Sequence, residues 1–274
     1  MWRIGTSTRV FWQYPIMKAI DSIASVGYKA VEIWAEHPQA MPRTLDNSRR
    51  EAIRQAIGKY DLLATLHASF RDLNLVSLNP PVRDESVKQV RESIELAHDL
   101  GVRCVCVHPG RLTGTRDSLT EAWQLTFDVF QDLANSAADL GITLAVENME
   151  NRNKEMIVTP EDCVQLVNTL KKPNVGITLD IAHANLTGRL RDFIGTVAGA
   201  IVHVHLSDNT GARPVHMPIG EGKIDIPSVL TDLRRESYKG LIVIEGYQPD
   251  MAPEKSAKKN LEKVMSLYNK PYDQ

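Results

Sequence analysis

Eight short apolar runs alternate with eight longer amphipathic stretches along the whole chain, and this alternation is the strongest constraint on its fold. The runs are rich in β-branched residues, which is typical of strands, and the stretches between them have helical spacing. We predict strands at Trp2–Thr6, Ala30–Trp34, Leu62–His67, Val102–His108, Ile142–Glu147, Val175–Asp180, Ile201–Leu206 and Leu241–Glu245. We predict helices at roughly 14–28, 46–59, 84–100, 119–140, 160–171, 190–198, 227–236 and 253–268.

Strands that alternate with helices form parallel sheets joined by right-handed crossovers. Eight such units in 274 residues, with no break in composition, favour closure. We therefore predict a single-domain (β/α)8 TIM barrel of α/β class over residues 1–274. A doubly wound open sheet is the alternative, and it is less favoured because no glycine-rich phosphate turn follows the first strand.

Helix ends are marked by specific residues. Gly27, Gly101, Gly141 and Gly240 each precede a predicted strand, where glycine ends a helix at low cost because it accepts positive φ. Thr159, followed by proline and two acids, predicts a helix start with a hydroxyl N-cap.

Composition excludes several classes of protein. The net charge is −2, from 32 basic and 34 acidic residues, which argues against a nucleic-acid protein with a broad basic surface. No apolar run reaches the ~18 residues that a membrane span needs, and no secretory signal is visible. Three cysteines are too few for a disulfide framework, so we expect them to be reduced and the protein to be cytoplasmic.

Six predicted strands have a histidine, an aspartate or a glutamate as their last or next-to-last residue. Each of these residues has the parity of one strand face, so a barrel would gather all six around one mouth. Independent solvated ends would include lysine, arginine, serine and asparagine, and none appears. Mixed carboxylates and imidazoles suit Zn²⁺, Mn²⁺, Co²⁺ or Fe²⁺, with Mg²⁺ less favoured. The six residues are His67, His108, Glu147, Asp180, His205 and Glu245.

Other polar residues lie near these ends. His183 follows the sixth strand by one turn, and His216 lies in the loop after the seventh. Glu32 faces the mouth by parity as a partner of ligands or a buried acid, and His203 is one layer deeper, inside the barrel. We take His37 and His98 as non-functional. Arginines in mouth loops could clamp a phosphate or carboxylate: Arg71, Arg83, Arg111 and Arg213.

Seven short motifs at these positions resemble the xylose isomerase-like TIM-barrel superfamily, which includes sugar isomerases, epimerases and endonuclease IV. Each motif alone is weak, but their order and strand positions are specific for the superfamily. The motifs are Leu66-His67-Ala68-Ser69, Val107-His108-Pro109-Gly110, Val146-Glu147-Asn148-Met149, Leu179-Asp180-Ile181-Ala182-His183, His205-Leu206-Ser207-Asp208, Gly220-Glu221-Gly222 and Ile244-Glu245-Gly246.

The resemblance to the ketose epimerase branch implies one divalent metal ion on Glu147, Asp180, His205 and Glu245. It also implies that the two glutamates act as acid and base and that His183 contacts the substrate. Trp34 and Arg71 are further candidates for substrate binding. The family also leads us to expect a homo-oligomer.

The resemblance to endonuclease IV implies a three-zinc cluster instead. Its ligands would match His67, His108, Glu147, Asp180, His183, His205, His216 and Glu245. That cluster also needs an aspartate two residues before His216, where this chain has Pro214, which carries no ligand atom.

The sequence therefore supports three functional hypotheses. The first is a metal-dependent isomerase or epimerase that moves a proton through an enediolate on a small sugar, sugar phosphate or polyol carbonyl compound; a dehydratase would share the first half of this chemistry. The alternative is a zinc-dependent phosphodiesterase acting on abasic DNA. The third is a barrel that binds a sugar without turnover. His67, His108, His183 and His216 would hold a second metal ion or contact the substrate.

Overall fold

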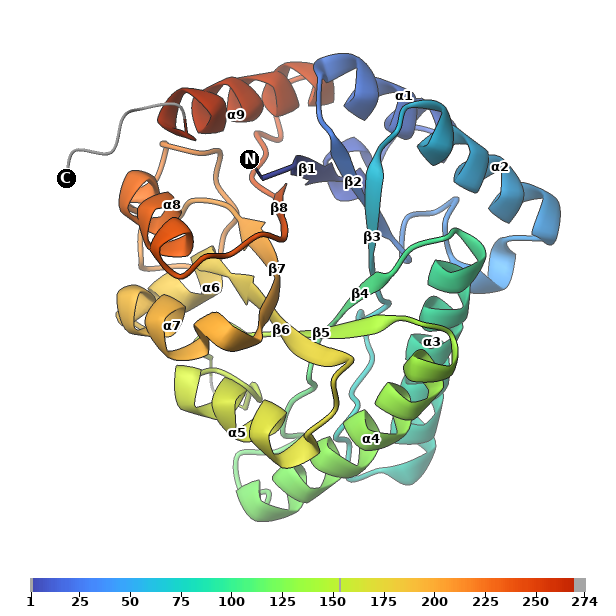
Figure 1. Ribbon diagram of the computed structural model, residues 1–274. Helices are drawn as coiled ribbons and strands as arrows, with labels where there is room; N and C mark the ends of the chain where they lie inside the picture. The colour runs from blue at the N-terminus through green and yellow to red at the C-terminus, as the bar shows by residue number, and fades with distance from the viewer. Residues whose placement is uncertain (1, 153, 269–274) are drawn as a thin grey trace.

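The computed structural model describes residues 2–152 and 154–268, and eight parallel strands in it close into a barrel in sequence order, β1 to β8. A ring of helices surrounds the barrel (Figure 1). This is the predicted TIM barrel, a single domain. The predicted domain limits of 1–274 include residues 1, 153 and 269–274, which lie outside the described residues.

The strands match the predicted runs to within two residues at each end. They are β1 (Ile4–Ser7), β2 (Ala30–Trp34), β3 (Leu63–His67), β4 (Cys104–Val107), β5 (Thr143–Glu147), β6 (Val175–Asp180), β7 (Ile201–Leu206) and β8 (Leu241–Ile244). His108 and Glu245 directly follow β4 and β8 rather than ending them.

The helices also lie where the amphipathic stretches predict them. They are α1 (Ile16–Val26), α2 (Asn47–Lys59), α3 (Pro80–Asp99), α4 (Leu119–Asp139), α5 (Pro160–Leu170), α6 (Ile181–Leu186), α7 (Leu190–Val197), α8 (Ile226–Arg235) and α9 (Pro253–Tyr268). Short 3-10 turns lie at η1 (Thr8–Phe11), η2 (Pro42–Thr44) and η3 (Ala198–Ala200).

Two helices differ from the prediction. The short α6 was not predicted, and it begins directly after β6 because the Asp180 carboxylate caps it by accepting a hydrogen bond from the His183 amide at 2.7 Å. Helix α3 begins at Pro80 rather than near residue 84, since proline is well suited to a first helical turn. Arg83 therefore lies in α3 and not in a mouth loop.

The predicted helix ends are mostly confirmed. Gly27, Gly101 and Gly141 have positive φ, whereas Gly240 does not, so the prediction for Gly240 was wrong. A Cβ at Gly240 would overlap the Tyr238 ring, so that position needs a small residue instead. Thr159 forms the predicted N-cap as part of a reciprocal capping box with Asp162.

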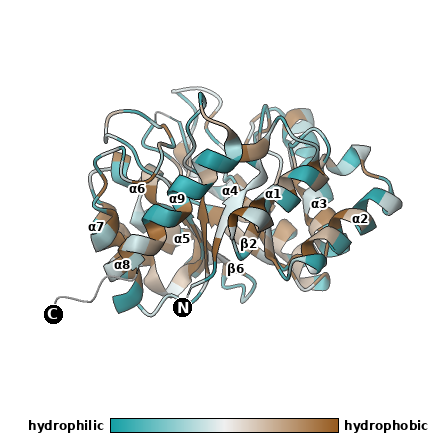
Figure 2. Ribbon diagram, turned by 90° about the horizontal axis from the view of Figure 1, so that it is seen from above, coloured by the Kyte–Doolittle hydropathy of each residue, from teal (hydrophilic) through white to brown (hydrophobic). Residues whose placement is uncertain are grey.

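The apolar core lies between the strands and the helices, where the outward face of each strand packs on the inward stripe of the helices. Figure 2 shows this hydrophobic centre, with long loops along the upper edge of the molecule. The barrel interior is different, because it holds buried polar side chains such as Glu32, Thr65, His203 and His205. The fold therefore separates an apolar shell, which stabilises it, from a polar centre that opens at the mouth.

Two further sequence predictions concern membranes and thiols. None of the described helices has both the length and the apolar character to cross a membrane. Cys104, Cys106 and Cys163 are all free thiols, as predicted.

Candidate active site

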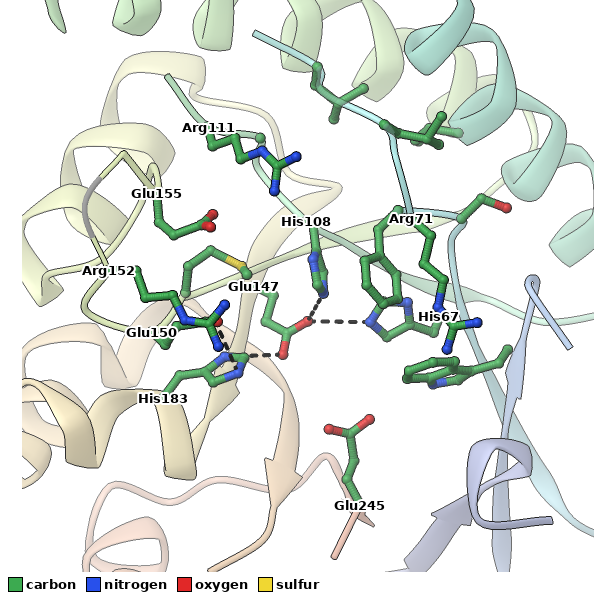
Figure 3. A pocket seen from close by; sticks show the side chains of 18 of the residues that line it. His67, Arg71, His108, Arg111, Glu147, Glu150, Arg152, Glu155, His183 and Glu245 are labelled. Carbon is green, nitrogen blue, oxygen red and sulfur yellow. Dashed lines mark ion pairs between the residues drawn. The ribbon is translucent and has the colours of Figure 1, made fainter. Parts of the chain in front are cut away.

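A cavity of about 370 Å³ opens at the mouth of the barrel, within the range of small-molecule sites. Side chains from different strand ends and mouth loops point into it (Figure 3). Its charged and aromatic lining residues include Arg9, Trp34, His67, Phe70, Arg71, His108, Arg111, Glu147, Glu150, Arg152, Glu155, His183, His216 and Glu245.

The structure brings the four predicted metal ligands together around His205. Nδ1 of His205 lies 3.1 Å from Oε1 of Glu147 and 3.8 Å from Oε2 of Glu245. Glu147, Asp180 and His205 each offer a ligand atom, and these atoms lie within 4.8 Å of one another. Residues separated by up to 98 positions in the sequence thus meet at one point because parallel strands end at one rim.

This donor set suits a divalent cation. Oδ2 of Asp180 and Oε1 of Glu245 are buried and have no hydrogen-bond partner, which is costly for carboxylate oxygens. A cation would satisfy both atoms. Three carboxylates and one imidazole are also the mixture preferred by Mn²⁺, Zn²⁺ or Co²⁺, so the residues present fit the predicted group.

Glu32 lies beneath His205 inside the barrel and accepts hydrogen bonds from three side chains. Its Oε2 atom is 3.2 Å from Nε2 of His205, 2.9 Å from Nε2 of His203 and 3.1 Å from Oγ1 of Thr65. A neutral His205 that donates its Nε2 proton to Glu32 would present the lone pair of Nδ1 to a cation at the mouth. The structure thus places Glu32 behind a candidate ligand, and His203 inside the barrel as predicted.

The alternation of acids and histidines controls their charge. Burial would raise the pKa of Glu147, but the rings of His205 and His108 hold it well below its ordinary value. Burial would lower the pKa of His205, but Glu245, Glu32 and Glu147 raise it well above the ordinary value. Burial raises the pKa of Asp180, with the charges of Glu147 and Glu245 adding to the effect.

His67 and His108 lie on the other oxygen of Glu147. Their Nε2 atoms are 3.4 Å and 3.2 Å from Oε2 of Glu147, as Figure 3 shows. Cys106 Sγ lies 3.3 Å from the same oxygen. The two histidines and the shared carboxylate therefore have the arrangement that a second ion or a substrate oxygen would need.

His183 and His216 form a pair on the far side of Asp180, with ring centroids 5.4 Å apart. Nδ1 of His183 is 3.7 Å from Glu147, and its Nε2 is 3.5 Å from Glu150. Burial would lower the pKa of His183, but Asp180, Glu147 and Glu150 raise it to about 9. His216 is 3.6 Å from Glu245 and bonds the Ser207 hydroxyl at 2.9 Å.

The other residues predicted for substrate binding also line the cavity. Trp34 is buried, and its indole Nε1 has no hydrogen-bond partner. The Arg71 guanidinium lies 4.7 Å from the Trp12 ring centroid and 3.3 Å from Glu36. His37 is buried beside Trp12, and His98 is exposed on α3, so both lie outside the cavity lining.

A family model described as the xylose isomerase-like TIM barrel matches residues 20–267. The chain belongs to this family. This confirms the resemblance seen in the seven sequence motifs.

Relatives of this family member include uncharacterized proteins and sugar epimerases. It is 32% identical to the uncharacterized protein MJ1311 of Methanocaldococcus jannaschii, over 89% of this chain and 83% of the relative. It is 21% identical to the fructoselysine 3-epimerase of Shigella flexneri, over 89% of each. A crystal structure of a D-tagatose 3-epimerase-like protein superposes with a TM-score of 0.86 at 30% identity, covering 97% of this chain and 98% of that one.

The family also contains nucleases. The chain is 20% identical to the protein named probable endonuclease 4 of Aquifex aeolicus, over 82% of this chain and 85% of the relative. At these identities the comparisons establish the family and the fold, and the reaction has to be argued from the site.

The structure also identifies site residues that the sequence did not predict. Glu150 lines the cavity, with its carboxylate 3.5 Å from Nε2 of His183. Arg9 also lines the cavity and lies just after β1. Glu150 lies in the loop three residues past the predicted strand end. Arg9 lies in η1, where no strand parity applies. Pattern alone therefore gave no signal for either residue.

Asp208 is a third such residue, and it organises the loop that carries His216. Its buried carboxylate accepts hydrogen bonds from four backbone amides at 2.8–3.0 Å, those of Asn209, Gly220, Gly222 and Ile224. The backbone amides of the Gly220-Glu221-Gly222 motif therefore bind the carboxylate of Asp208, a side chain of the protein itself, rather than a small molecule. A Cβ at Gly222 would overlap both the Asp208 carboxylate and the Asn209 carbonyl oxygen.

We predict that Gly222→Ala destabilises the protein by about 1–3 kcal/mol, because the overlap forces the loop off Asp208. Gly199→Ala is the matched control, since a Cβ there meets nothing within 4 Å. Urea unfolding of both variants measures the difference. Equal stability of the two variants would show that the loop does not depend on this contact.

Proposed function

We propose that this protein is a metal-dependent isomerase or epimerase that moves a proton next to the carbonyl of a small sugar or sugar-like compound. The observation that carries the proposal is the placement of two carboxylates across one cavity. Glu147 ends the fifth strand and Glu245 follows the eighth, and both point to the same open space (Figure 3). The names of the epimerase relatives support the same reaction class.

Glu147, Asp180, His205 and Glu245 would hold the cation. When bound, a divalent cation would polarise the substrate carbonyl and its neighbouring hydroxyl and stabilise the negative charge that develops there. Mn²⁺, Zn²⁺ and Co²⁺ are the best candidates, and Mg²⁺ or Fe²⁺ would also bind oxygen and nitrogen ligands.

One glutamate would remove the proton α to the carbonyl and the other would return it. Histidines keep the pKa of both Glu147 and Glu245 below the ordinary value despite burial, so both are ionised and able to accept a proton at neutral pH. Because one lies at the end of β5 and the other after β8, the two carboxylates would act on different sides of a substrate carbon bound between them. Return of the proton from the opposite side gives epimerisation, and return to the neighbouring carbon gives isomerisation.

Other cavity residues would bind and orient the substrate. His183, Trp34 and Arg71 are within the lining and offer an imidazole, an unpaired indole N–H and a guanidinium. His67 and His108 would bind substrate hydroxyls or a second ion with Glu147. The aromatic side chains of Trp34 and Phe70 reduce water access on one side of the cavity.

The nuclease remains the second candidate because His67, His108, His183 and His216 all surround the same carboxylates. Pro214 takes the place of one zinc ligand that the endonuclease resemblance requires. The near-neutral charge of the chain also gives little support for binding a DNA backbone. We therefore favour the sugar reaction.

We predict that the purified protein binds a divalent metal ion stoichiometrically and that Asp180→Ala and His205→Ala each abolish this binding. Each substitution removes a ligand from a site that has only four. Metal binding is measured as the metal content of each protein after dialysis. The control is Asp225→Ala, which changes an exposed N-cap residue of α8. Full metal content in both site variants would contradict the assignment.

We also predict that the metal-loaded enzyme exchanges solvent deuterium into a suitable ketose at the carbon next to the carbonyl. Glu245→Gln should lose this exchange, because the amide has nearly the same shape but cannot accept the proton. Nuclear magnetic resonance of the recovered sugar measures it. Metal-dependent nicking of abasic duplex DNA, lost in His108→Ala and Glu147→Gln and accompanied by no exchange on any sugar, would favour the nuclease instead.

A further inference from the structure

We infer that the cavity contains a subsite for an anionic group of the substrate, a phosphate or a carboxylate, built on Arg9. This inference rests on the proposed function, since it names the class of sugar-like compound that the same cavity takes. The substrate would then be a phosphorylated or acidic polyhydroxy carbonyl compound.

Arg9 is a partly buried arginine whose guanidinium forms no direct ion pair with any described residue, although its charge helps to lower the pKa of the nearby Glu245 carboxyl. Its guanidinium carbon lies 4.9 Å from the Trp34 ring centroid and 5.8 Å from that of Tyr247. Within residues 2–152 and 154–268 no hydrogen bond or ion pair is formed by its guanidinium. A guanidinium has five N–H donors in a planar fork that matches the oxygens of a carboxylate or phosphate.

The other arginines of the cavity show what makes Arg9 different. Arg71 is 3.3 Å from Glu36, and Arg152 is 3.1 Å from Glu150, so both charges are already balanced. Both guanidinium groups are also more than half exposed to solvent. Arg111 also lines the cavity and forms no ion pair within the part of the chain that the structure describes, but it is exposed to solvent. Arg9 is therefore the half-buried arginine of this group with donors free for a ligand, and aromatic faces hold it in place.

A second donor without a partner lies beside Arg9. The indole Nε1 of Trp34 is buried and makes no hydrogen bond, although a buried N–H group without a partner costs about 1–3 kcal/mol. Trp34 lines the same cavity as Arg9 and contacts its guanidinium. An oxyanion bound by Arg9 would therefore lie beside the Trp34 ring.

The order of strands around the barrel places Arg9 beside one candidate metal ligand and across from two others. Glu245 follows β8, which pairs with β1, and therefore lies on the Arg9 side. Arg9 follows β1 and Trp34 ends β2, whereas Glu147 and Asp180 end β5 and β6, on the other side of the closed barrel (Figure 1). The cavity thus has Glu147 and Asp180 on one side, and Arg9 with Glu245 on the other. A substrate with its carbonyl at the metal site and an anionic end at Arg9 would complement both.

The space around Arg9 also extends outward. A neighbouring hollow of about 440 Å³ is lined by Arg9, Trp12, Arg71 and Tyr247. Arg71 is stacked on Trp12 at the edge of this hollow, with its charge balanced by Glu36. The subsite therefore has room for a tetrahedral phosphate as well as a planar carboxylate.

The anionic subsite can be tested by binding alone, with sugar alcohols and sugar acids that have no ketone or aldehyde group and therefore cannot react. Sorbitol, sorbitol 6-phosphate and gluconate are titrated into the metal-loaded protein by calorimetry at constant ionic strength. We expect at least one anionic compound to bind about tenfold or more tightly than sorbitol, as charge-assisted hydrogen bonds predict. Comparison of sorbitol 6-phosphate with gluconate identifies whether the group is a phosphate or a carboxylate.

Substitutions of Arg9 test whether this residue causes the tighter binding of anionic compounds. Arg9→Gln should remove the preference for the anion, and Arg9→Lys should retain part of it because the charge remains without the planar fork. Arg213→Gln is the matched control, since it removes the same charge from an exposed mouth loop and leaves the cavity intact. A preference that is absent, or that survives in Arg9→Gln, would overturn the inference.

Deuterium exchange on the same variants separates this inference from the proposed function. In one outcome, neutral and phosphorylated ketoses exchange deuterium at the same rate, and Arg9→Gln does not change this rate. That outcome would support the proposed isomerase or epimerase and overturn the anionic subsite. Binding of an anion that depends on Arg9, with no exchange on any sugar, would support the subsite and overturn the proposed reaction.

Discussion

His205 lies between two buried carboxylates, and the rest of the site depends on this interaction. Its Nε2 atom bonds Glu32 inside the barrel, and its Nδ1 atom faces Glu147 at the mouth. A lone buried carboxylate or imidazolium would be strongly unfavourable, but alternating acids and histidines stabilise one another. This line of groups is what orients one imidazole nitrogen toward the cavity.

The buried row of Glu32, His205 and Glu147 is tolerated because the stability of the fold comes from another part of the molecule. The layer between the strands and the helices is continuous and apolar, and it includes large buried side chains such as Phe11, Phe130 and Phe193. The barrel interior can therefore contain charged side chains, and the mouth can contain the residues of the candidate active site. The Asp208 carboxylate extends the same arrangement by fixing the loop that carries His216.

Much of the site was predictable because it follows from strand parity. Four of its residues lie at or one position before the ends of their strands on the inward face, so the sequence alone predicts the convergence of His67, Glu147, Asp180 and His205. Residues outside strands could not be predicted in this way. Arg9 depends on the path of a 3-10 turn and on aromatic faces from β2 and from the loop after β8. Asp208 depends on amides up to 16 residues away.

The fold was predictable to a similar degree and for the same reason. Periodic patterns report which face of an element is buried, so they locate all eight strands. They carry no information on α6, whose six residues are too few for a helical period and whose start depends on the Asp180 cap. Sequence also does not give the reaction, because it depends on which groups face one another across the cavity.

The central claim is that one divalent ion binds at the mouth, on the Nδ1 side of His205. Anomalous diffraction from crystals grown with Mn²⁺ tests it most directly, because the signal locates the ion independently of activity. The account predicts a single strong peak that is bonded to Nδ1 of His205 and to oxygens of Glu147, Asp180 and Glu245. A peak on the other side of the ring, among Glu32, His203 and Nε2 of His205, would contradict it, as would the absence of any peak at the mouth.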